Sequence, residues 1–130
     1  MKLKVSYTYP DGPTLNGNIY SPEVLASAFH EPVFQEINQA KAIPVKGYIG
    51  GPTIGLASAT LNTNKVEIDA VIFDKTYEEI LQQVYNYAGI SLAGMCNREP
   101  SGTLTDIKYR EALLTSYPAV SCSMEIVEES

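Results

Sequence analysis

Strict alternation of apolar and polar side chains is the feature that most limits how this chain can fold. Apolar residues alternate with polar ones over residues 2–9, 65–73 and 119–127. Because successive side chains of a strand point to opposite faces of a sheet, each segment predicts a strand with one buried face. Short apolar segments bounded by Gly, Pro or Asn predict four more strands, over 43–49, 53–61, 90–96 and 104–114. The chain is therefore expected to be rich in β-sheet.

Two helical patterns interrupt these strands. Ser21-Pro22-Glu23 combines an N-cap residue, a proline at the first helical position and an acid in the first turn. Asp74 precedes an amphipathic pattern that runs to Ala88, and Gly89 is expected to end that helix in the left-handed conformation. Pro32 interrupts the first pattern, so a further short helix is predicted over 33–40.

These elements predict an α+β fold. We expect a β-rich small barrel or sheet of about six to seven mostly antiparallel strands, flanked by two or three helices. With 130 residues the chain is long enough for one core, and a single domain over 1–130 is expected. A content of 45% hydrophobic and 18% charged residues is typical of a folded globular protein.

Charge and cysteine content exclude several functional classes. The net charge of −6, without any Lys/Arg cluster, argues against nucleic-acid binding, and no apolar run reaches the length of a membrane span. Cys96 and Cys122 match neither a zinc motif nor a redox motif, so we expect two buried free thiols in a soluble, intracellular protein. No cofactor or metal site is predicted.

A candidate nucleophile lies where the second helical pattern ends. The segment 88–95 places Ser91 on a short apolar strand directly after a helix stop, which is one way to hold a reactive serine still. Most serines in such positions are ordinary strand residues. Glu111 follows in the next predicted strand and is a candidate partner.

The candidate bases are few. A serine hydroxyl is a poor nucleophile unless a base takes its proton during attack. His30 is the only histidine, and its place at the end of a predicted helix is explained more simply by contact with the helix dipole or solvent. Lys46 could form a Ser-Lys pair with Ser91, provided that burial favours its neutral form.

The order of these segments resembles the prohead proteases of tailed phages, which share their fold with the herpesvirus assembly proteases. The resemblance extends over about residues 16–126. It is carried by the Asn-Gly turn at 16–17, the helix start at 22–25, the Ile-Pro-Val strand at 43–45, the Gly-Ile-Ser strand at 89–91 and the segment 111–119.

The resemblance implies roles for two residues and a departure at a third position. In that family a serine on a short strand after the long helix is the nucleophile, which matches Ser91, and Glu111 matches the residue that orients the base. The base is a histidine at the end of the first central strand. Here the segment 43–51 carries Tyr48 or a neighbour in that place. A tyrosine is protonated at neutral pH and is a poor substitute.

This departure leads to an expected function. We expect the fold to be retained and the peptidase activity to be lost, as in a phage capsid accessory protein of the cement or decoration type. Its partner would be the major capsid protein or another virion protein, and it would reside in the virion and, during assembly, in the host cytoplasm. A homo-oligomer is compatible with this hypothesis, whereas nucleic acid and membranes are not expected partners.

Two alternatives remain open. The first is an active capsid-maturation serine protease that uses Ser91 with Lys46, or with His30 if the fold brings it near. The second is a small binding module unrelated to phage, because each of the motifs is short.

Overall fold

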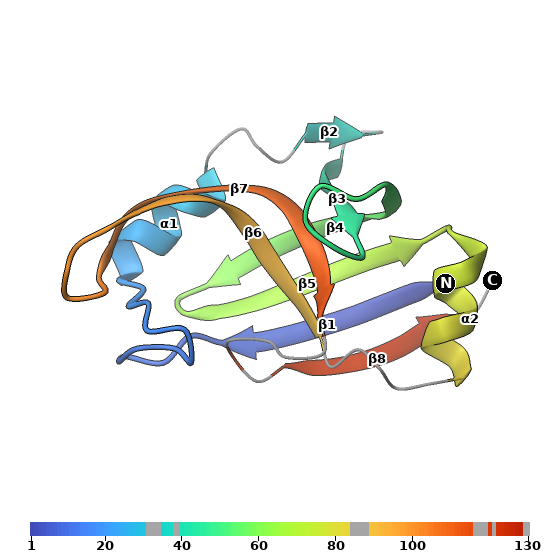
Figure 1. Ribbon diagram of the computed structural model, residues 1–130, viewed down its shortest axis with the longest axis horizontal. Helices are drawn as coiled ribbons and strands as arrows, with labels where there is room; N and C mark the ends of the chain where they lie inside the picture. The colour runs from blue at the N-terminus through green and yellow to red at the C-terminus, as the bar shows by residue number, and fades with distance from the viewer. Residues whose placement is uncertain (31–34, 38–39, 84–88, 116–119, 121, 129–130) are drawn as a thin grey trace.

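The computed structural model describes residues 1–30, 35–37, 40–83, 89–115, 120 and 122–128 (Figure 1). These residues form eight strands and two helices, which confirms the predicted β-rich α+β fold. The strands are β1 (Lys2–Thr8), β2 (Gln35–Ile37), β3 (Ala40–Lys46), β4 (Thr53–Asn62), β5 (Lys65–Ile72), β6 (Gly89–Arg98), β7 (Leu104–Thr115) and β8 (Ser123–Glu128). The helices are α1 (Pro22–His30) and α2 (Lys75–Gln83), and neither is long and apolar enough to cross a membrane.

The strands form one curled sheet. Its order is β6-β7-β3-β4-β5-β1-β8, with β2 paired to β3 beside this path. Only β3 and β7 run parallel, and the other pairs are antiparallel. Figure 1 shows β6 and β7 passing across β4, β5 and β1, so that the sheet folds over its own core. In the described part of the chain β6 and β8 do not pair with each other, so the curled sheet stays open along one seam.

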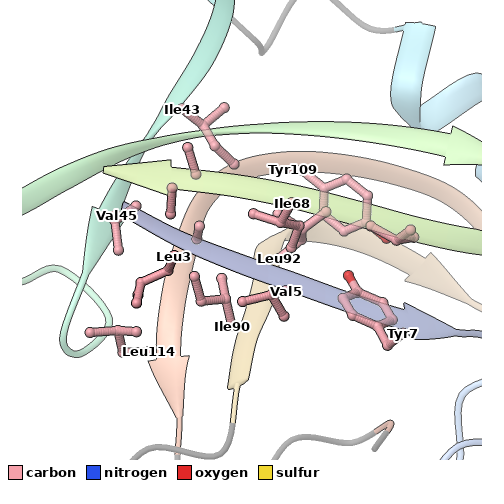
Figure 2. Packing of buried hydrophobic residues seen from close by; sticks show 14 of the residues in the cluster. Leu3, Val5, Tyr7, Ile43, Val45, Ile68, Ile90, Leu92, Tyr109 and Leu114 are labelled. Carbon is pink, nitrogen blue, oxygen red and sulfur yellow. The ribbon is translucent and has the colours of Figure 1, made fainter. Parts of the chain in front are cut away.

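The predicted alternation positions the core. Leu3, Val5 and Tyr7 of β1 are buried, and Leu3 and Val5 pair with the buried Ala70 and Ile68 of β5. The predicted β4–β5 hairpin is also confirmed. Figure 2 shows that Tyr7 and Tyr109 lie at one end of this core, whereas Val45 and Leu114 lie at the other. The buried tyrosines Tyr7 and Tyr109 therefore lie at the same end of the core.

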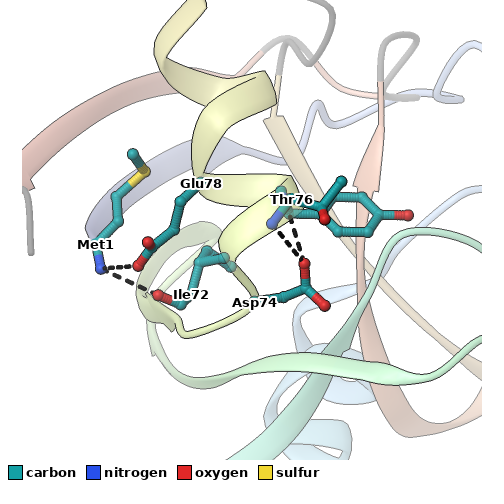
Figure 3. A network of polar contacts seen from close by, with 6 residues as sticks. Met1, Ile72, Asp74, Thr76 and Glu78 are labelled. Carbon is teal, nitrogen blue, oxygen red and sulfur yellow. Dashed lines mark hydrogen bonds and ion pairs between the residues drawn. The ribbon is translucent and has the colours of Figure 1, made fainter.

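Local capping begins both helices where the sequence predicts. The Ser21 hydroxyl accepts a hydrogen bond from the Val24 amide at 3.2 Å, one turn into α1. The Asp74 carboxylate accepts hydrogen bonds from the amides of Thr76 (3.0 Å) and Tyr77 (3.2 Å) at the start of α2 (Figure 3). α1 packs against β7 and β4, and Phe29 meets Tyr109 edge to face.

The helix predicted over 33–40 is wrong. Residues 35–37 form β2, which pairs antiparallel with β3 in the register Glu36↔Lys41. Residues 33–34 and 38–39 lie outside the described part of the chain. A short apolar pattern does not distinguish a helix from a strand, and here the partner strand decides the outcome. The neighbouring strand, predicted over 43–49, is correspondingly shifted to Ala40–Lys46.

Gly89 is not the predicted left-handed helix end. It is the first residue of β6, and it is absent from the positive-φ glycines of the described chain, which are Gly17, Gly50 and Gly102. A Cβ atom at Gly89 would lie 2.5 Å from the Cys122 sulfur. A side chain at position 89 would therefore overlap Cys122, which explains why this position is a glycine. Residues 84–88 of the predicted helix, and 116–119 and 121 of the predicted turn and last strand, lie outside the described part.

Candidate functional site

The fold places Ser91 and Lys46 on one face of three adjacent strands. Ser91 lies between the buried residues Ile90 and Leu92 of β6, so its side chain is on the opposite, outer face. It pairs with Leu113 of β7, and Leu113 pairs on its other side with Lys46, the last residue of β3. Lys46, Leu113 and Ser91 thus form a row across the sheet.

Lys46 is held away from Ser91. Because neighbouring strands are about 4.8 Å apart, Lys46 and Ser91 are separated by roughly 10 Å of sheet, with Leu113 between them. The Lys46 ammonium donates a hydrogen bond to the Gly51 carbonyl at 2.7 Å. This contact closes the loop between β3 and β4, and it gives Lys46 a structural role in the arrangement observed.

Glu111 shares this outer face. It pairs with Ala93, so it is a diagonal neighbour of Ser91 across the β6–β7 pair. Diagonal positions are about 7–8 Å apart, within reach of a long side chain. Ser91, Lys46 and Glu111 thus share one face of the sheet, and their catalytic roles stay predictions. Within the described residues, however, the Ser91 hydroxyl has no side-chain hydrogen-bond partner.

The other two bases considered do not complete the site. Tyr48 lies in the loop after β3, is 60% exposed, and covers Gly51 with its ring. It points to solvent and does not reach β6. His30 is the last residue of α1, and its side chain lies outside the described part of the structure. The described side chains thus bring a serine and a carboxylate to one face, and no hydrogen bond joins the Ser91 hydroxyl to Glu111, Lys46 or Tyr48 among them.

The two cysteines differ from expectation in one respect. Cys122 is half-buried, and burial raises the pKa of its thiol. Cys96 is exposed, so the prediction that it is buried is wrong. Its position on β6 explains the difference: the sheet does not close at this strand, and no neighbouring strand covers its free edge. No group of three or more His, Cys, Asp or Glu side chains gathers as a metal site among the described residues.

The curled sheet, with helices around it and a serine on an edge strand after the second helix, defines a fold like that of a viral protease. No protein-family model matches the chain, and no curated protein matches its sequence. The crystal structure of KSHV protease in complex with a hexapeptide phosphonate inhibitor is similar, with a TM-score of 0.57 and 10% identity. The likeness covers 97% of this chain and 66% of the KSHV protease chain. This chain therefore spans slightly less than two thirds of the length of the KSHV protease.

At this level of identity, the likeness concerns the fold alone. The fold part of the predicted resemblance, to the herpesvirus assembly proteases, is confirmed. Membership of a phage family and the loss of the base histidine stay predictions.

Proposed function

We propose that this protein is a non-catalytic capsid accessory protein of a tailed phage, of the cement or decoration type, built on a protease-like fold. The observation that carries the proposal is the environment of Ser91. Its hydroxyl has no base beside it among the described residues, and the Lys46 ammonium is bound to the Gly51 carbonyl instead. The likeness to KSHV protease supports the protease-like fold in this proposal.

The large contribution that a general base makes to the rate of serine proteolysis supports a non-catalytic role, because no such base is bonded to Ser91 among the described residues. A positioned general base raises the rate by about 10²–10⁴, and loss of one member of a coupled set can cost more. For Lys46 to act, it would have to leave Gly51 and pass Leu113 to approach Ser91. The β3–β4 loop would lose its closing hydrogen bond in the same step.

A candidate surface for a protein partner lies on the other half of the sheet. The outer face of β4, β5, β1 and β8 carries a shallow hollow of about 470 Å³. Leu56 and Val71 are paired neighbours there, and Val127 and the stems of Lys2 and Lys4 border them. An exposed apolar area with a polar rim is typical of a protein-binding surface. A virion protein is the partner that fits the proposal.

Particle composition is the direct test of the proposal. In purified mature particles from the source of this sequence, quantitative mass spectrometry should find many intact copies of the chain per particle. A shell component is retained after maturation because its function is to hold the shell together. Absence from mature particles, combined with presence in immature ones, would overturn the proposal.

The alternative is an active capsid-maturation serine protease. Its specific support is that Ser91, Glu111 and Lys46 share one face of β6, β7 and β3. Labelling with a fluorophosphonate probe separates the two functions, because such probes react with activated serines. We expect wild-type protein to label no more than Ser91→Ala, and to remain uncleaved during expression. Ser58→Ala, at a half-buried serine on β4, is the matched control. Stoichiometric labelling that disappears only in Ser91→Ala would establish the protease.

A further inference from the structure

The open seam of the sheet contains a cavity of about 200 Å³. One wall is the free edge of β6, where five consecutive residues, 90–94, line the cavity. A strand that faced the cavity with one side would contribute every second residue, so it is the backbone edge that borders the space. The side chain of Ser91 points to the outer face, and only its backbone belongs to this wall.

The opposite wall of the cavity is formed by the end of β1, beyond the point where its pairing with β8 stops. Pairing of β1 with β8 ends at Ser6↔Ser123, whereas pairing with β5 continues to Thr8↔Lys65. Among the residues that the structure describes, Tyr7 therefore has no paired neighbour on the β8 side, and together with Tyr9 it lines the cavity. The gap in strand pairing and the cavity are thus the same feature of the fold.

Four tyrosines surround the space. Tyr9 stacks on Tyr20 with ring centroids 4.3 Å apart, and Tyr7 meets Tyr9 edge to face at 5.3 Å. The hydroxyls of Tyr9 and Tyr109 form a buried hydrogen bond of 3.1 Å. The Tyr9 hydroxyl also hydrogen-bonds the Tyr7 hydroxyl, so the three hydroxyls use two of their three protons, and one proton can be donated to another acceptor. Aromatic surface and a directed hydrogen-bond donor are therefore combined in one place (Figure 2 shows Tyr7 and Tyr109).

The described lining carries no ionisable carboxylate, ammonium, guanidinium or imidazole group. This contrasts with the whole chain, which has 15 acidic and 9 basic residues. Burial raises the pKa values of Tyr7, Tyr9 and Tyr109 above their usual value, so these hydroxyls are neutral at physiological pH. A charged ligand would lose hydration here without gaining a charged partner, which is costly. The chemistry of the walls favours an uncharged occupant.

We propose that this cavity binds a small uncharged molecule with one aromatic ring and one hydrogen-bonding group. The ring would pack among the tyrosines, and its polar group would bond to the hydroxyl chain of Tyr7, Tyr9 and Tyr109 or to the backbone edge of β6 beyond Ile90. The size agrees, because an apolar cavity of about 150 Å³ binds benzene. This binding site is independent of the proposed capsid function, and it does not require Ser91 to be reactive.

The first test uses p-cresol as the probe and 4-hydroxybenzoate as its charged counterpart. Titration of the full chain, followed by amide chemical shifts, should show saturable changes at residues 7–9 and 90–96 with p-cresol. A ligand with few atoms in a suitable pocket reaches a Kd of about 1 mM or tighter. Replacing the methyl group by a carboxylate should weaken binding at least ~10-fold. Absence of saturation, or equal binding of the two probes, would overturn the proposal.

A pair of variants locates the site. Tyr20→Ala removes a half-buried wall and should weaken p-cresol binding by ~2- to 10-fold, because aromatic pairing adds about 0.5–1.5 kcal/mol. Tyr48→Ala removes an exposed tyrosine outside the cavity and should leave the Kd unchanged. Equal effects of the two variants would contradict the assignment.

A second measurement uses the wild-type protein and does not depend on either variant folding. Cys96 pairs with the buried Ile107 and borders the cavity, although the thiol is exposed. Saturating p-cresol should slow alkylation of Cys96 by iodoacetamide several-fold. An unchanged alkylation rate at a p-cresol concentration that saturates the chemical shifts would place the ligand elsewhere and overturn the proposal.

Discussion

Replacing Glu78 by glutamine should lower the free energy of unfolding by about 3–5 kcal/mol, the usual cost of breaking a buried ion pair. The amino group of Met1 lies 3.0 Å from the Glu78 carboxylate and also donates to the Ile72 carbonyl at 3.0 Å (Figure 3). The side chains of Met1 and Glu78 are only 1% and 12% exposed. Glutamine keeps the size of the side chain and removes its charge, so the Met1 ammonium would lose its attraction to this carboxylate.

Glu79→Gln is the matched control for this prediction. Glu79 is the next residue of α2 and is exposed, so its charge contributes little. Urea unfolding of the wild-type chain and both variants measures the difference. Equal stabilities for Glu78→Gln and Glu79→Gln would show that the Met1–Glu78 pair contributes no net stability.

Replacing Gly94 by alanine should cost about 3 kcal/mol or more, at the upper end of overpacking effects. A Cβ atom at Gly94 would lie 1.8 Å from the Lys108 carbonyl oxygen and 2.8 Å from the Tyr109 Cα atom. Both atoms belong to the backbone of β7, so no side-chain rotation can relieve the overlap. The register of β6 on β7 also shifts between Ala93 and Gly94, where Arg110 of β7 is left unpaired, so the substitution falls opposite a bulge in β7.

Gly12→Ala is the control, because a Cβ at Gly12 would meet no atom within 4 Å and its φ is not positive. It should change the free energy of unfolding by no more than about 1 kcal/mol, in the stabilising direction. Thermal or urea unfolding of the two variants supplies the comparison. If Gly94→Ala were as stable as Gly12→Ala, the close packing of β6 on β7 would be wrong.

Much of the fold could be predicted because its signals are local. Alternation in 2–9 and 65–73 corresponds to β1 and β5, and the capping residues Ser21 and Asp74 mark the helix starts. The wrong predictions concern segments whose structure depends on contacts with residues elsewhere in the chain. Residues 35–37 become a strand because β3 pairs with them, and Gly89 is required by Cys122, a residue far along the chain.

For the candidate site, too, only the local features were predictable from the sequence. Alternation within a strand indicates the face on which Ser91 or Glu111 lies. It does not indicate that β7 lies between β3 and β6, which places Leu113 between Lys46 and Ser91. The tyrosine cavity depends on where β1 and β8 stop pairing, and that register has no local signal in the sequence.

The position of β1 inside the sheet has a consequence for how the chain reaches its native state. Val5 pairs with Ile68 on one side and with Met124 on the other, so the first strand made needs a partner among the last. At about 5–20 residues per second of synthesis, β1 waits roughly 6–24 s for β8. Sheets with such distant pairings fold in about milliseconds to seconds. Ribosomal synthesis, rather than strand assembly, thus sets the time during which β1 exposes an unpaired edge.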